Sequence, residues 1–215
     1  MREIFHTELD ELIGDLARMA RLAGQMMTNA STALQHADLG LAELVISRED
    51  EMAALCDEMD QRCINLLALQ APVAVDLRVV VAAMRAVRDL GRMGTLAQHV
   101  AKIARLKHPN VPLPDDVRPV FARMGMLAAG LAEGAATAIE KQDAMSSARL
   151  AEADGEVDAL RRQILRILFA EDWSHGVEPA VDAALIGRYY ERFADHAVAI
   201  ASQVSFLVTG QPPQR

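Results

Sequence analysis

Two acidic pairs stand out among the side chains that could do chemistry. Asp154 and Asp158 are four residues apart, and so are Glu191 and Asp195. On an α-helix this spacing puts both members of a pair on one face, with β-carbons about 5–6 Å apart. Carboxylates held so close repel one another unless solvent, arginines or a cation offset the charge. Each pair is therefore a candidate for binding a cation.

The two acidic pairs together could form one metal site. Both are predicted on helices of one antiparallel group, so their carboxylates can meet on one patch. Hard oxygen ligands of this kind suit Mg²⁺, Mn²⁺ or iron, whereas zinc more often takes His or Cys. Without a cation, at least one of these carboxylates should have a raised pKa. We predict a metal site formed by Asp154, Asp158, Glu191 and Asp195.

Two other interpretations of the acids stay open. In most helical proteins such a pair is a solvated face, and Arg188 and Arg192 stand three residues before Glu191 and Asp195 as ion-pair partners. A plain scaffold without metal is then expected. The alternative is an enzyme in which a carboxylate-bridged metal pair activates water to hydrolyse a phosphate ester. The sequence identifies no general acid and no open ligand position for such an enzyme, and it has no Gly-rich phosphate loop and no nucleophile elbow. We therefore expect a protein that is not an enzyme.

The composition predicts that helices packed on helices position these acids. Hydrophobic residues make up 52% of the 215 residues, but aromatic residues only 4%. The net charge of −8 argues against binding to nucleic acid or to anionic lipid. No apolar stretch reaches the roughly 18–20 residues of a transmembrane helix, and charges replace the apolar core of an export signal at the start. We expect an all-α cytoplasmic protein that does not insert into the membrane.

The chain contains an internal duplication. A shift of 105 residues aligns Ala17-Arg18-Met19 with Ala122-Arg123-Met124, and a shift of 100 residues aligns Arg88 with Arg188. Matches in the same order over three segments indicate a copied unit. A half of about 105 residues is long enough for one small hydrophobic core.

Helical periodicity predicts three helices in each half. Asp38 is expected to cap the second helix, and the three prolines of His108–Pro114 cannot continue a helix. We predict two tandem, pseudo-symmetric three-helix bundles, with a first domain over 1–108, a Pro-rich linker over 109–114 and a second domain over 115–215. The expected helices cover about 3–35, 39–69, 76–107, 115–141, 145–169 and 180–208.

The duplication also serves as an internal control for the acidic pairs. The positions equivalent to the four acids hold Glu49, Ala53, Gly91 and Thr95, so the first half lacks three of the four carboxylates. His99 follows Thr95 by four residues and could replace a ligand, but a lone His on a helix is more often structural. We predict metal on the second bundle and little or none on the first.

Two segments resemble the PhoU family of phosphate-uptake regulators, and the likeness covers nearly the whole chain. Leu66–Arg78, with the sequence LLALQAPVAVDLR, is similar to that family's loop between its second and third helices. Glu191–His196, with the sequence ERFADH, is similar to its acidic metal motif. The family also has a duplicated arrangement of three helices. The sequences of both segments are similar to those of its actinobacterial branch.

The resemblance implies a cytosolic, non-catalytic regulator of phosphate uptake. It implies contacts with the ATPase subunit of the phosphate ABC transporter and with a sensor histidine kinase, which keep the phosphate-starvation response off when phosphate is plentiful. It also implies a homodimer. Finally, it implies a divalent or trivalent metal ion (Mg, Mn, Fe or Zn) at Glu191 and Asp195, with Asp154 and Asp158 as the matching pair.

Overall fold

The computed structural model describes residues 2–211, and their side chains from Phe5 onward. Within that range the chain forms six helices and no strand, as the periodicity predicts. The helices are α1 (Arg2–His36), α2 (Leu39–Gln70), α3 (Ala74–Lys107), α4 (Arg118–Lys141), α5 (Ser146–Leu168) and α6 (Val177–Thr209).

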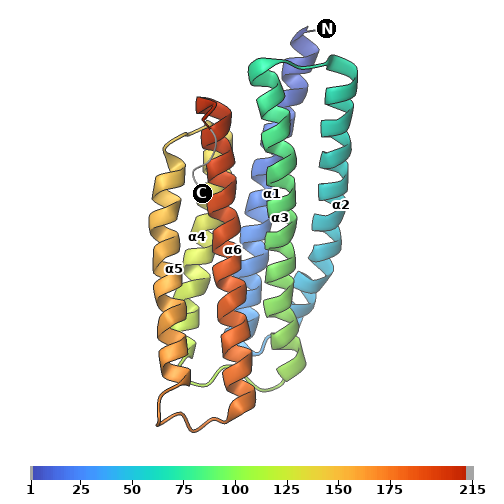
Figure 1. Cartoon of the computed structure of the whole chain (residues 1–215). Coiled ribbons are helices and arrows are strands. Elements are labelled where there is room, and N and C mark those ends of the chain that lie inside the picture. The colour runs from blue at the N-terminus through green and yellow to red at the C-terminus, as the bar shows by residue number, and fades with distance from the viewer. Residues whose placement is uncertain (1, 212–215) are drawn as a thin grey trace.

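The helices form two antiparallel trios that lie side by side (Figure 1). The first trio is α1, α2 and α3, and the second is α4, α5 and α6. At the centre, α1 packs on α4 and α3 packs on α6, so that each half contributes two helices. α2 and α5 cover the outer sides of their own halves. The predicted class, an all-α protein made of two pseudo-symmetric three-helix bundles, is confirmed.

The ends of α2 follow signals in the sequence. Asp38 caps the start as predicted, because its carboxylate accepts a hydrogen bond from the backbone N–H of Leu41 at 3.0 Å. At the other end, the chain turns sharply around Pro72. Ala71 and Ala74 take positive φ angles of 44° and 51°, which are costly for residues with a β-carbon. This turn lets α3 begin at Ala74, two residues before the predicted start.

The second half differs from the prediction at two helix starts. α4 begins at Arg118 and not at residue 115, because the residues after Pro114 form a turn in which the Arg118 N–H donates to the Pro114 carbonyl at 3.1 Å. α6 begins earlier than predicted, at Val177, and includes Pro179 in its first turn. Proline is tolerated there because the first helical N–H groups have no partner within the helix.

One hydrophobic core runs through both halves. Side chains from α1, α4 and α6 meet in this core. The hydroxyls of Ser31 and Tyr190 lie 2.6 Å apart, and the Tyr190 ring packs near that of Phe121, with 6.1 Å between centroids. Small residues let α1 and α4 approach closely, since a β-carbon added at Gly24 would lie 3.0 Å from that of Ala132. The boundaries of the two domains stay a prediction, and residues 1 and 212–215 lie outside the described part.

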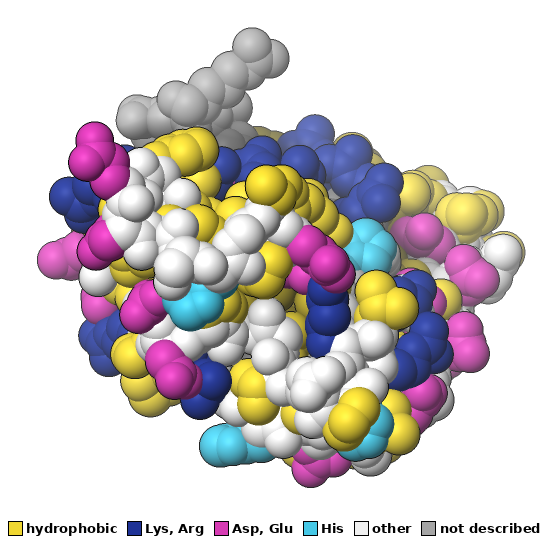
Figure 2. Space-filling view, turned by 90° about the horizontal axis from the view of Figure 1, so that it is seen from below, with side chains coloured by type: hydrophobic (Ala, Val, Ile, Leu, Met, Phe, Trp, Pro, Cys, Tyr) yellow, Lys and Arg dark blue, Asp and Glu magenta, His cyan; other side chains and the backbone are white. Residues whose placement is uncertain are grey.

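The lower end of the molecule shows hydrophobic side chains among charged ones (Figure 2). Phe169 and Val177, which flank the α5–α6 loop, are 82% and 80% exposed. In that loop the Trp173 indole N–H donates to the Gly176 carbonyl at 2.8 Å. None of the helices described here combines the length and the apolar character needed to cross a bilayer.

Candidate metal centre

The four predicted acids lie on two neighbouring helices. Asp154 and Asp158 belong to α5, Glu191 and Asp195 belong to α6, and α5 packs directly against α6. The charges of Asp158, Glu191 and Asp195 all act on Asp154, so the four carboxylates share one patch. We call these four residues the acidic patch.

The patch is electrostatically strained at Asp154. Burial, followed by the charges of Asp195, Asp158 and Glu191, raises the pKa of Asp154 to about 6. Its Oδ1 is buried and has no hydrogen-bond partner among the described residues. The pKa of Asp195 is also raised, first by burial and then by Glu191. A raised carboxylate pKa was predicted from the sequence, and its cause is burial before charge repulsion.

Arginines already hold one member of the patch. The Glu191 carboxylate, only 14% exposed, forms ion pairs with Arg161 of α5 at 3.1 Å and with Arg188 at 2.5 Å. The predicted pair of Arg188 with Glu191 is thus confirmed, whereas Arg192 forms no ion pair with Asp195 in the described structure. Arg161 was not predicted, because it reaches Glu191 only through the packing of two helices.

The patch is not a finished coordination sphere. Among residues 2–211, no three His, Cys, Asp or Glu side chains are gathered closely enough to hold a metal ion as they stand. Asp154, Asp158 and Asp195 form no ion pair with a described residue, whereas Glu191 is paired with two arginines. A cation would have to draw Asp154, Asp158 and Asp195 together, and to compete with Arg161 and Arg188 for Glu191.

The equivalent positions on the first half hold one carboxylate where the second half holds four. The Thr95 hydroxyl lies 3.3 Å from Oε1 of Glu49, the one carboxylate at these four positions, and 3.1 Å from the Gly91 carbonyl. A β-carbon added at Gly91 would lie 3.1 Å from the Cys56 sulfur. The neighbouring His99 packs on Tyr189 of α6, with 5.1 Å between ring centroids. Desolvation by burial lowers the pKa of His99, so its ring favours the neutral form.

One buried polar contact was not predicted. Asp89 of α3, only 6% exposed, lies 3.0 Å from Nδ1 of His196 on α6. The contact joins the two halves beside the acidic motif. A signal was present, because Asp89 interrupts an apolar face that includes Ala86, Leu90 and Met93. The partner could not be read from the sequence, since it is 107 residues away.

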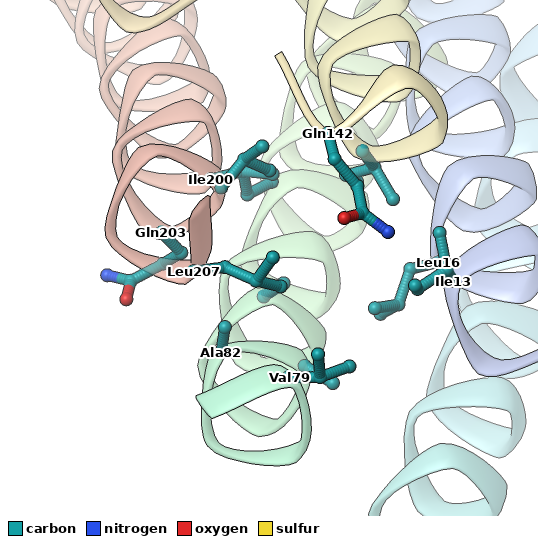
Figure 3. Close-up of a pocket in the computed structure, with 12 residues that line it drawn as sticks. Ile13, Leu16, Val79, Ala82, Gln142, Ile200, Gln203 and Leu207 are labelled. Carbon is teal, nitrogen blue, oxygen red and sulfur yellow. The ribbon is translucent and has the colours of Figure 1, made fainter. Parts of the chain in front are cut away.

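A separate cavity lies among α1, α3, α4 and α6 (Figure 3). Its volume is about 30 Å³, and its lining is apolar apart from Gln142 and Gln203. The Gln203 amide points away from the other labelled side chains (Figure 3). No acid, His or Cys lines it, so it offers no group for acid–base or metal chemistry.

Each of the two trios matches the same known protein domain. The model of the PhoU domain matches residues 16–104 and again residues 121–204, once on each trio. The chain belongs to the PhoU family. The two matches also confirm that the halves are copies of one unit.

Relatives that match over nearly the whole chain also belong to the PhoU family. The phosphate-specific transport system accessory protein PhoU homolog 2 of Mycobacterium tuberculosis is 46% identical over 213 residues, which cover 99% of this chain and 100% of the relative. The PhoU homolog 1 of Mycobacterium leprae is 44% identical, covering 100% of this chain and 96% of the relative. These names describe accessory proteins and not enzymes, in agreement with the non-catalytic function that was expected and not with the phosphohydrolase.

Crystal structures of PhoU proteins have the same fold. PhoU from Pseudomonas aeruginosa superposes with a TM-score of 0.86 at 28% identity, covering 96% of this chain and 100% of that one. The phosphate transport system regulatory protein PhoU from Streptococcus pneumoniae gives a TM-score of 0.88 at 25% identity, covering 98% and 100%. The six-helix arrangement is therefore that of PhoU proteins.

Proposed function

We propose that this protein is a cytoplasmic regulator of phosphate uptake and of the phosphate-starvation response. It acts by contact with the ATPase subunit of the phosphate ABC transporter and with a sensor histidine kinase. The observation that carries this proposal is the full-length match, at 46% identity, to an accessory protein of a phosphate-specific transport system. A homodimer is part of the proposal, and the molar mass in solution tests it.

Binding to the two named partners tests the regulatory function. The purified chain is immobilised and offered the transporter ATPase and the kinase from the same organism, in buffers with and without phosphate and divalent metal. We expect at least one of the two to be retained, and retention to depend on phosphate or metal. If neither protein binds under any of these conditions, the proposed function is wrong.

We further propose that the acidic patch binds a divalent or trivalent cation of the Mg, Mn, Fe or Zn class. Asp154, Asp158 and Asp195 supply oxygen ligands, and Glu191 joins when its arginines withdraw. Two features support this. The buried Asp154 Oδ1 lacks a hydrogen-bond partner among the described residues, and the charges of Asp195, Asp158 and Glu191 add to burial in raising the Asp154 pKa to about 6. A bound cation would offset this charge.

Metal analysis tests this proposal. Wild type is compared with Asp154→Asn/Asp195→Asn by elemental analysis after purification and by calorimetric titration with Mn²⁺. The matched control is Asp57→Asn/Asp60→Asn, which removes two exposed acids from α2. We expect the patch variant to lose binding and the control to keep it. Equal binding by both variants, or no metal above background in wild type, would contradict the proposal.

A further inference from the structure

A row of arginines follows the outward faces of α3 and α6. Every member of the row is exposed to solvent. In the end view of Figure 2, Lys and Arg side chains gather along the upper edge of the molecule. We call this row the arginine face, and it consists of Arg85, Arg88 and Arg92 on α3 with Arg188 and Arg192 on α6.

Contacts between α3 and α6 set the order of the row. Arg85 donates a hydrogen bond to Gln203 at 3.3 Å, Asp89 pairs with His196, and His99 packs on Tyr189. The helices therefore run antiparallel, which brings the α6 arginines beside the part of α3 that follows Arg92. From Arg85 to the level of His99 is 14 residues, or about 21 Å along the helix. The arginines thus follow one another every three or four residues along the seam.

Most of this positive charge has no acidic partner. Arg88, Arg92 and Arg192 form no ion pair or hydrogen bond with any residue that the structure describes. Within residues 2–211, the one hydrogen bond of the Arg85 side chain goes to the neutral Gln203, and its guanidinium lies 6.0 Å from the centroid of the Phe206 ring. α3 as a whole carries seven Lys and Arg residues against two acids, in a chain whose net charge is −8. Arg188 is the exception, because it pairs with Glu191 of the acidic patch. The uncompensated positive charge therefore lies on Arg85, Arg88, Arg92 and Arg192.

The shape of the arginine face limits what can bind there. All five side chains are exposed, so a small anion would stay in water and gain little. An anionic bilayer is a wide plane, and α2, which packs beside α3, exposes Asp50, Asp57 and Glu58, which a membrane would repel. A helix is about 10 Å wide and matches a narrow row.

We propose that the arginine face docks an acidic amphipathic helix of a partner protein. Carboxylates three or four residues apart on such a helix recur about once per turn of 5.4 Å, which is the spacing of the row. Val181 and Leu185, 50% and 44% exposed, continue the α6 part of the row and provide an apolar contact at one end. This inference rests on the proposed function in one respect, that the chain acts through protein contacts.

A synthetic peptide tests the inference on the full chain. The probe is a fluorescent, amphipathic peptide of about 18 residues, long enough to form a helix, with glutamates on one face. Its affinity is measured by anisotropy for wild type, for Arg88→Gln/Arg92→Gln and for Arg162→Gln/Arg166→Gln. The last pair is a matched control, because both arginines are exposed on α5 at the same spacing. We expect the first variant to bind about tenfold more weakly and the control to match wild type.

Three results would overturn the inference. The first is that Arg162→Gln/Arg166→Gln weakens binding of the probe as much as Arg88→Gln/Arg92→Gln does. The others are that wild type binds equally well a peptide whose glutamates are spread around the helix, or that it does not bind the probe. Binding of the chain to phosphatidylserine vesicles that is lost in Arg88→Gln/Arg92→Gln would assign the face to a membrane instead. A dimer that dissociates on the same change would assign it to a second copy.

The two proposals can fail separately. If the ATPase or the kinase binds wild type and Arg88→Gln/Arg92→Gln equally, the proposed function stands and the arginine face is not its docking site. If neither protein binds wild type but the probe binds as expected, the docking surface stands and its partner lies outside the phosphate system.

Discussion

At the scale of single residues, Asp154 imposes a cost on the folded protein at neutral pH. Its pKa rises from 3.8 to about 6 on folding. Below about pH 4 the carboxyl is protonated in both the folded and the unfolded chain, and the penalty is absent. Between pH 4 and 6 only the unfolded chain ionises freely, so the penalty grows with pH and is complete at about pH 7.

Removal of this charge should therefore stabilise the protein. We expect Asp154→Asn to raise the free energy of unfolding by about 1 kcal/mol at pH 7, after allowance for the partial exposure of the group, and to have little effect near pH 4. Urea unfolding at both pH values in metal-free buffer measures this. The exposed Glu152 provides the control, since Glu152→Gln should change little at either pH. A loss of stability at pH 7 in Asp154→Asn would contradict the explanation.

At the scale of helices, the turn between α2 and α3 carries backbone strain. Ala71 and Ala74 both have positive φ angles, although neither is a glycine. The turn follows from Pro72, which has no N–H with which to continue α2 and which restricts the residue before it. Strain of this kind persists only where the surrounding helices hold the chain in place.

Glycine at the strained position should improve stability. We expect Ala71→Gly to stabilise the protein by about 1 kcal/mol, because glycine takes positive φ without a steric penalty. Ala68→Gly, three residues earlier on the exposed side of α2, should destabilise it by about 1 kcal/mol, because glycine weakens a helix interior. Thermal unfolding of the two variants compares them. The same sign of change for both would refute the interpretation.

Most of the helices could be predicted from the sequence. Only some of the contacts between them could be predicted. Apolar periodicity and the signals at Asp38 and Pro72 are local, so six helices and most of their ends followed from the residues. The start of α3 was missed because its N-cap residue, Val73, has no side chain that can cap a helix. The acidic patch was predicted because duplication and helical spacing are visible in sequence. The role of Arg161 and the pairing of Asp89 depend on which helices pack together, and no local signal fixes that.

At the scale of the whole molecule, the two copies are joined by buried polar contacts as well as by apolar packing. Asp89 and His196 connect α3 to α6, and Ser31 and Tyr190 connect α1 to α6. Because the core is also continuous, we expect the halves to unfold together. Fluorescence of Trp173, the single tryptophan, reports on the second half, and far-ultraviolet circular dichroism reports on all helices. The two transitions should coincide in urea, and separate midpoints would show independent domains.

Loss of one partner of the Asp89–His196 contact should weaken both halves. We expect His196→Ala to lower the free energy of unfolding by about 2 kcal/mol, because it leaves the nearly buried Asp89 without its partner. Asp89→Ala/His196→Ala should be less destabilised than the sum of the two single changes. Chemical denaturation of the three variants measures this coupling. Strict additivity would mean that the contact contributes nothing.

The close approach of Gly91 to the Cys56 sulfur bears on how the copies diverged. A glutamate at residue 91 would place its β-carbon 3.1 Å from that sulfur, so the Cys56 side chain would have to shift slightly to accept it. A smaller residue at position 56 would remove this contact, so that a glutamate at residue 91 would fit without displacing a neighbour. A glutamate at residue 91 is therefore accepted more readily once position 56 holds a smaller side chain, and the order in which the two substitutions are made decides whether the intermediate loses stability.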